Sequence, residues 1–238
     1  LYYRALKRDP KPLLRSTEFK VYLAIVAAIT IWAFVMSGSD GGQAAGFRDS
    51  LFTTVSTVTT TGYVVTEYGL WSQTVQLVLL LAMPIGAMAG STAGGVKVVR
   101  VIAVASFAHR EALRQLHPRL VRPVRIGGGV LPDDVARRVL GFLVLALAIL
   151  GGGAFLISTT GPDMITSFSS SATAFGNVGP GLGALDHAND FLSIPRLGRA
   201  IAMAQMLLGR LEIYPVILAL SVITLRIPAA LHPHRSVD

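Results

Sequence analysis

Residues 49–63 read DSLFTTVSTVTTTGY, and residues 163–177 read DMITSFSSSATAFGN. Each stretch opens on an aspartate, is rich in Ser and Thr, and ends near a glycine, Gly62 in the first and Gly176 in the second. Each is too short to cross a bilayer and is flanked by long apolar segments. We therefore expect two re-entrant pore loops, each a short helix followed by an extended strand. The unpaired carbonyls of such a strand are tolerated in a bilayer only where they line a cavity or hold an ion.

The composition is that of a membrane protein. Of the 238 residues, 52% are hydrophobic and 14% are charged, whereas a soluble domain carries about 25% charged residues. Gly, Pro, Ser and Thr within the apolar segments indicate that several of these segments pack on protein or line a pore. The absence of cysteine excludes disulfides and thiolate metal sites. The net charge of +8 is explained better by basic cytoplasmic loops than by nucleic acid, which we do not expect as a partner.

The same order of elements occurs in both halves of the chain: a crossing helix, a pore loop and a long helix. This order predicts an internal repeat of about 115 residues, with Gly62 and Gly176 in equivalent positions. The expected fold is an all-α membrane protein with two parallel helix–pore loop–helix repeats of a pseudo-fourfold potassium-channel-like pore. The expected units are a first repeat in residues 1–110 (helix 19–36, pore loop 47–63, broken helix 71–107), a basic connector in 111–138, a second repeat in 139–226 (helix 139–157, pore loop 163–179, helix 201–225) and a tail in 227–238.

The apolar segment at residues 71–107 is longer than the roughly 20 residues that a simple crossing needs. Its middle, residues 84–97, reads PIGAMAGSTAGGVK. A proline and four glycines in so short a stretch weaken a helix severely. We expect two half-helices around a non-helical break, the alternative being close helix packing through small residues.

Charge asymmetry predicts the orientation. Lys and Arg concentrate in the N-terminal stretch, the connector and the tail, so this side is expected to be cytoplasmic. The opposite loops carry six acidic residues, together with Arg48, Arg196 and Arg199. Two of these acidic residues, Asp49 and Asp163, are expected to cap the pore helices. The acidic residues concerned are Asp40, Asp49, Glu67, Asp163, Asp186 and Asp190.

Residues 59–63 read TTTGY, which is similar to the threonine-x-glycine-tyrosine core of a potassium filter. In such a filter, successive carbonyls replace the hydration shell of an ion, and glycine permits backbone angles that a side chain would forbid. The second copy lacks this core, because Asn177 stands in the place of Tyr63 and Phe175 in the place of Thr61. Divergent copies imply a pseudo-symmetric pore made within one polypeptide. The alternative is an ordinary Thr/Gly-rich turn outside the membrane.

Four motifs in order make the sequence resemble the Trk/Ktr/HKT superfamily, and most closely the TrkH-type potassium uptake family. They are TTTGY (59–63), AGSTAGGVKVVR (89–100), FGNVGPGLG (175–183) and LLGRLEIYPV (207–216). The resemblance runs from about residue 19 to residue 225. It implies four repeats around one K⁺ pathway, of which this chain matches the third and fourth, so we expect the C-terminal half of a subunit.

The resemblance also implies roles for individual residues. The filter backbone would comprise Thr60, Thr61, Gly62 and Tyr63 with Ala174, Phe175, Gly176 and Asn177. The gate beneath it would comprise Gly90, Ser91, Thr92, Ala93, Gly94 and Gly95, with Arg210 projecting towards it. A charge in the middle of an apolar helix needs an acceptor. For Arg210 this could be the carbonyls of residues 90–95 or Glu212 of a neighbouring chain or repeat, and the arginine could equally be a structural clamp.

The function implied by the resemblance is potassium uptake in the bacterial inner membrane by a multi-pass protein with cytoplasmic termini. The implied partners are the N-terminal repeats or a second copy, a homodimer of full-length subunits, and a cytoplasmic nucleotide-binding (TrkA-like) regulatory subunit. K⁺ is the transported ion, and no covalent cofactor or further metal is expected. The alternative is a non-conducting fragment or assembly subunit. An intramembrane enzyme with Ser91 or Thr92 as nucleophile is not expected, because no His or Asp lies within a crossing segment to act as base.

Overall fold

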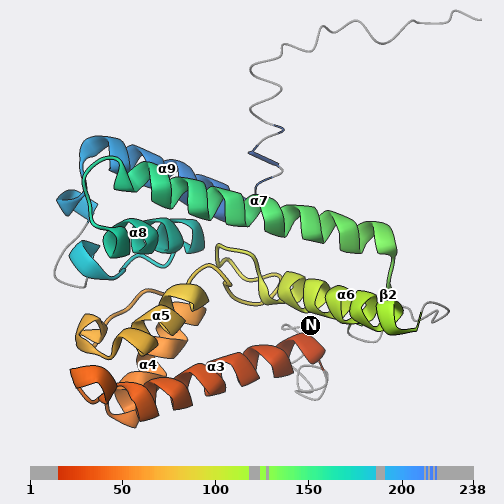
Figure 1. The fold of residues 1–238 in the computed structure, drawn as a ribbon, viewed down its shortest axis with the longest axis horizontal. Coiled ribbons are helices and arrows are strands. Elements are labelled where there is room, and N and C mark those ends of the chain that lie inside the picture. Colours follow the sequence, from red (N-terminus) through yellow and green to blue (C-terminus); the bar gives the residue numbers. More distant parts are fainter. Residues whose placement is uncertain are drawn as a thin grey trace, which may run out of the picture.

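The computed structural model describes residues 16–117, 124–126, 129–185, 191–211, 213, 215, 216 and 218. The described residues form two helical units that lie side by side (Figure 1). The first unit contains α3 (Thr17–Met36), α4 (Phe47–Val58), α5 (Gln73–Ala82) and α6 (Val98–Leu116); the second contains α7 (Asp133–Ser158), α8 (Met164–Gly176) and α9 (Arg196–Arg210). A short antiparallel hairpin, β1 (Val124–Ile126) and β2 (Gly129–Leu131), lies between them, and 3₁₀ turns occur at Ser39–Gly41, Tyr68–Leu70, Gly183–Leu185 and Phe191–Ser193.

Two of the described helices, α3 and α7, are long and apolar enough to cross a membrane. Both expose large apolar side chains along their length. On α7, for example, Leu147 is 60% exposed and Phe155 is 67% exposed. An extended apolar surface of this kind marks contact with a membrane or another protein. The exposed apolar surface of α7 is defined here by Val144, Leu147, Phe155 and Leu156.

The two units share their packing. The first core gathers Tyr68, Trp71 and Val75 around α3 and α5, and it includes Leu182 from the second unit. The hydroxyl of Tyr68 donates a hydrogen bond of 2.9 Å to the carbonyl of Gly181. This bond is buried, where a lost partner is costly, so it fixes the loop after α4 against the loop after α8.

The long apolar segment at residues 71–107 is not one helix in the structure. It comprises α5 and α6, separated by residues 83–97, which are not helical. Within this stretch, Gly86, Gly90 and Gly95 have positive φ angles of 72°, 82° and 80°. These angles are easily adopted only by glycine.

The last apolar segment also differs from the expected helix 201–225. Helix α9 begins at Arg196, directly after Pro195, and ends at Arg210, with Leu211 as its C-cap. Arg210 is therefore the last residue of α9, and the described residues at positions 213, 215, 216 and 218 are again helical. Several features of the sequence lie outside the described residues: the basic stretch 1–15, parts of the connector (118–123 and 127–128), Asp186, Asp190, Glu212 and the tail 227–238.

The two pore-helix candidates start differently. Asp163 is the N-cap of α8, and its carboxylate accepts a hydrogen bond of 3.3 Å from the Thr166 N–H. Hydrogen bonding from Thr166 lowers the pKa of the Asp163 carboxyl. The expected cap at Asp49 is wrong, because Gly46 is the N-cap of α4 and makes no side-chain bond. Asp49 lies in the first turn, where its charge still favours the positive end of the helix dipole.

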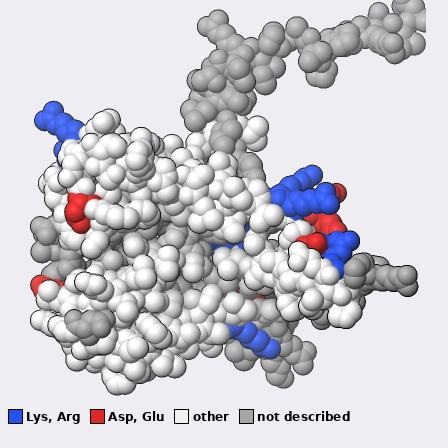
Figure 2. Space-filling view, in the orientation of Figure 1, with Lys and Arg blue, Asp and Glu red and all other residues white. Residues whose placement is uncertain are grey.

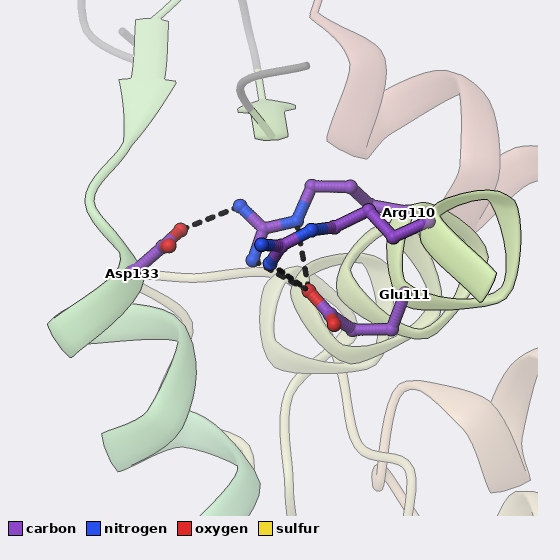
Figure 3. A network of polar contacts seen from close by, with 4 residues as sticks. Arg110, Glu111 and Asp133 are labelled. Carbon is purple, nitrogen blue, oxygen red and sulfur yellow. Dashed lines mark hydrogen bonds and ion pairs between the residues drawn. The ribbon is translucent and has the colours of Figure 1, made fainter. Parts of the chain in front are cut away.

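Charged side chains gather at one end of the molecule, where α6 ends and α7 begins, while most of the face drawn in Figure 2 is uncharged. The guanidinium of Arg110, which is only 7% exposed, donates to Asp133 on α7 and, at 3.0 Å, to Glu111 (Figure 3). The N–O distance to Asp133 is 2.5 Å. This ion pair ties the end of the first unit to the start of the second.

Replacing Asp133 by alanine is expected to lower the thermal unfolding temperature, because the buried Arg110 keeps only Glu111 as a partner. Asp134→Ala is the matched control: Asp134 lies in the same first turn of α7, and within the described part of the chain it makes no ion pair. Equal losses in both variants, measured by thermal scanning in detergent, would show that helix-end electrostatics acts here and that the Arg110 pair does not.

Candidate functional site

Helices α4 and α8 carry their hydroxyl groups inward. On α8, the Ser171 hydroxyl donates a hydrogen bond of 2.7 Å to the Leu150 carbonyl. The Ser169 hydroxyl accepts a hydrogen bond of 2.6 Å from the Leu182 N–H. These bonds attach α8 both to α7 and to the loop that follows α8. The buried Ser and Thr residues of the two helices are Ser50, Thr53, Thr54, Ser56 and Thr57 on α4 and Thr166, Ser167, Ser169, Ser170, Ser171 and Thr173 on α8.

The residues after α4 form a tight turn that we term the first loop segment (residues 59–63). Thr60 has φ +57° and Gly62 has φ +79°. The Thr61 N–H donates a hydrogen bond of 2.9 Å to the Ser56 carbonyl, and the Ser56 hydroxyl donates one of 2.7 Å to the Tyr63 carbonyl. The last turn of α4 thus holds both ends of the segment.

The residues after α8 form a second loop segment (residues 177–180) with the same pattern. Asn177 has φ +56° and Gly179 has φ +113°. The Val178 N–H donates a hydrogen bond of 3.0 Å to the Thr173 carbonyl, and the Thr173 hydroxyl donates one of 3.0 Å to the Pro180 carbonyl. Each of these features lies 117 residues after its counterpart in the first segment.

This register corrects the sequence-based pairing of the two loops. Gly62 corresponds to Gly179, not to Gly176, which lies three residues earlier. Ala174, Phe175 and Gly176 belong to the last turn of α8, so they are helical and not part of an extended strand. A Cβ added at Gly176 would lie 2.4 Å from the Met83 carbonyl oxygen, which identifies this glycine as a helix-packing position. Of the four expected filter residues in this half, only Asn177 lies in the second loop segment.

The correct register was present in the sequence. Aligning the Ser/Thr runs, so that Ser50 pairs with Ser167, places Gly62 on Gly179. Aligning the first glycine after each run instead gives the wrong pairing, because α8 continues one residue past the position equivalent to the end of α4.

The two loop segments lie against each other. A Cβ added at Gly62 would be 2.0 Å from the Val178 carbonyl oxygen and 3.3 Å from Pro180 Cδ. Only a glycine allows this approach of the two backbones.

Both segments leave carbonyl groups without donors. Within the described part of the chain, no hydrogen bond ends on the carbonyl oxygens of Thr60, Thr61 and Gly62, or on those of Asn177, Val178 and Gly179. Thr61 and Gly179 are exposed, and Thr60, Gly62 and Asn177 are partly exposed, so most of these residues are open to an incoming ligand. The partly negative C-terminal ends of α4 and α8 point to the same region, which favours a cation there.

Residues 83–97, termed the glycine-rich loop, close on themselves. The Val96 N–H donates a hydrogen bond of 2.9 Å to the Pro84 carbonyl, and the Lys97 N–H donates one of 2.8 Å to the Ile85 carbonyl. The carbonyls of Pro84 and Ile85 are therefore satisfied by the opposite arm of the loop. The Ala89 N–H donates to the Glu18 carboxylate at the start of α3, which holds the tip of the loop.

The glycine-rich loop contacts the second loop segment. A Cβ added at Gly94 would lie 2.7 Å from Asn177 Nδ2 and 2.7 Å from the Gly176 carbonyl oxygen. The Asn177 amide in turn donates 3.1 Å to the Met206 carbonyl on α9. The loop, the second segment and α9 thus meet at one residue, Asn177.

Arg210 does not reach the glycine-rich loop. Its side chain is exposed, and among the described residues no hydrogen bond joins it to residues 90–95. Glu212, the other expected acceptor, lies outside the described residues. Helix α9 instead approaches the last turn of α8 through Gly209, where an added Cβ would be 1.9 Å from the Phe175 carbonyl oxygen. Arg100, at the start of α6, donates a hydrogen bond of 3.3 Å to the Val96 carbonyl, and its guanidinium lies 4.1 Å from the Phe142 ring centroid.

These features define a class of protein: a helical membrane protein in which two short helices end at neighbouring loop segments with unpaired carbonyls. A family model described as TrkH, cation transport protein, matches residues 20–226. The chain belongs to the TrkH family of cation transport proteins, which confirms the resemblance noted in the sequence. Members of this family are transporters and not enzymes.

Individual relatives agree with the family. The chain is 35% identical over 205 residues to the Trk system potassium uptake protein TrkH of Halomonas elongata, covering 84% of this chain and 40% of that protein. It is 32% identical over 220 residues to TrkH of Vibrio parahaemolyticus, covering 89% and 44%. The crystal structure of the potassium transporter TrkH from Vibrio parahaemolyticus superposes with a TM-score of 0.81 at 31% identity, covering 92% of this chain and 48% of that chain. The chain therefore spans less than half the length of these relatives.

Proposed function

We propose that this chain forms half of a potassium transport pathway, to which the first and second loop segments contribute coordinating carbonyls. The observation that carries the proposal is the set of six donor-free carbonyls on two segments whose backbones touch. A carbonyl array replaces the hydration shell of K⁺, and the adjoining helix ends favour the positive charge. The coordinating residues would be Thr60, Thr61, Gly62, Asn177, Val178 and Gly179, with Tyr63 at the end of the first segment.

The glycine-rich loop is proposed as the gate of this pathway. The position of the loop supports this role, because Gly94 lies directly against Gly176 and Asn177, at the start of the second loop segment. The loop is also held at both of its arms and at its tip, so it has a defined closed position. Arg210 retains a proposed role through α9, because Met206 contacts Asn177 of the second segment and Gly209 contacts the last turn of α8.

The remaining parts of the proposal concern the setting of the chain. The protein would lie in the bacterial inner membrane with the basic connector and the termini in the cytoplasm. The relatives are about twice as long, so the other filter strands would come from preceding repeats of the same polypeptide or from a second copy. A homodimer of complete subunits and a cytoplasmic nucleotide-binding partner on the basic face complete the proposed assembly.

The chain alone is expected not to conduct, because two loop segments provide only half of a fourfold coordinating ring. The experiment is rescue of potassium uptake in a transport-deficient cell by the complete protein and by this chain, with matched expression. The complete protein should rescue growth at low K⁺, and the chain alone should not. Ion flux through a demonstrated monomer of the chain in liposomes would contradict this expectation. Failure of the complete protein to rescue would favour the alternative, a non-conducting assembly subunit.

A further inference from the structure

A cavity of about 360 Å³ lies between the two units. One wall comes from the end of α5 and the glycine-rich loop, the other from the middle of α7 and from α8. Its lining includes Leu81, Ile85 and Val96 on the first side and Leu147, Gly151 and Phe168 on the second. Its volume is within the range of about 300–1,000 Å³ that ligand sites occupy.

The cavity offers nothing to a polar ligand. Ser171 is the one polar side chain among its described lining residues. Its hydroxyl already donates a hydrogen bond of 2.7 Å to the Leu150 carbonyl and accepts one of 2.8 Å from the Gln205 amide. An ion or a polar molecule would lose its hydration here without gaining hydrogen bonds, at a cost of several kcal/mol. The occupant must therefore be apolar.

The cavity is continuous with the exposed apolar surface of α7. Leu147 belongs to both, and it is 60% exposed, as is Leu81 on the opposite rim at 62%. The α7 residues that line the cavity lie between Leu143 and Gly151, near the middle of a 26-residue helix long enough to span a bilayer. At that depth the surroundings are hydrocarbon.

We propose that this cavity binds an acyl chain of a membrane phospholipid. The inference requires only that the protein is embedded in a membrane, and it does not depend on the proposed ion pathway. The acyl chain would rest against Ile85 and Val96, which lie on the two hydrogen-bonded arms of the glycine-rich loop. The lipid would thus support the base of this loop from the side.

Two adjacent glycines provide a matched test. Gly151 lines the cavity, whereas Gly152 does not, and both lie in α7. A Cβ added at either position would meet nothing within 4 Å. Phenylalanine at 151 fills the cavity, while phenylalanine at 152 makes the same change in helix propensity and hydrophobicity next to it. Gly151→Leu is a smaller filler for use if the larger one reduces the folded yield.

The experiment uses the complete protein in vesicles of phosphatidylethanolamine and phosphatidylglycerol that contain a phospholipid with a diazirine in the middle of its acyl chain. After photolysis, peptide mapping should show label on residues 143–151 and 168–172 in the wild type. Gly151→Phe should lower the label on residues 168–172 at least about fivefold, and Gly152→Phe should leave it unchanged. Equal labelling in all three proteins, loss in both variants, or no label with cross-links between copies would overturn the proposal; the last result would identify a second copy as the occupant.

Discussion

Gly62→Ser is expected to remove most of the discrimination between K⁺ and Na⁺ in the complete protein. The φ angle of +79° at Gly62 costs a residue with a side chain about 1–2 kcal/mol. The added Cβ would also overlap the Val178 carbonyl oxygen at 2.0 Å, so the two loop segments must separate. Displaced carbonyls no longer match a dehydrated K⁺ better than Na⁺, so the ratio of K⁺ to Na⁺ flux should fall towards one.

Three further glycines make this result specific. Gly179→Ser should also reduce the flux ratio, because Gly179 has φ +113° and holds the equivalent position in the second loop segment. Gly176→Ser should instead lower the amount of folded protein, because its Cβ would meet the Met83 backbone. Gly161→Ser is the control. Gly161 lies in the turn between α7 and α8 with a φ angle of +121°, and a Cβ added there would meet no atom within 4 Å. A change in selectivity with Gly176→Ser and none with Gly179→Ser would restore the register that the structure overturned.

Gly94→Ala is expected to raise flux per molecule by about tenfold. The added Cβ would lie 2.7 Å from both the Asn177 amide nitrogen and the Gly176 carbonyl oxygen. Overpacking of this kind costs about 1–3 kcal/mol, which the glycine-rich loop can relieve by moving away from the second segment. Rubidium flux into vesicles, divided by the number of folded molecules, measures the effect.

Gly90→Ala is the control for this variant, because Gly90 is exposed in the same loop and a Cβ there would meet nothing within 4 Å. Its φ of +82° carries the backbone strain without the contact. Arg210→Ala should change the flux less than Gly94→Ala, because no hydrogen bond joins Arg210 to this loop among the described residues. A lower folded yield with unchanged flux per molecule in Gly94→Ala would show that the glycine-rich loop only packs between helices and does not gate the pathway.

The sequence identified the family, the two Ser/Thr-rich short helices and the break at residues 84–97, because each depends on local composition. Glycines and a proline within an apolar run, or hydroxyls within a short helix, act on the backbone directly. The register of the second loop was missed because Gly176, the first glycine after the second Ser/Thr run, lies in the last turn of α8. The Ser/Thr runs themselves carry the correct register, which pairs Gly62 with Gly179.

The sequence also did not reveal the surroundings of Arg210. A charge in an apolar segment needs a partner only where it is buried, and Arg210 is exposed at the end of α9. The carbonyls of Pro84 and Ile85, released by the break in the apolar segment, are satisfied by Val96 and Lys97 from the opposite arm of the loop. Pairing within a broken segment is a tertiary property, and hydropathy does not reveal it.

The measurement that tests the central claim most directly is the position of Rb⁺ in crystals of the complete protein, by anomalous scattering. The account predicts a peak bounded on one side by the carbonyls of Thr60, Thr61 and Gly62 and on the other by those of Asn177, Val178 and Gly179. A protein that transports Rb⁺ but shows its peaks elsewhere, with no density between these two segments, would contradict the account.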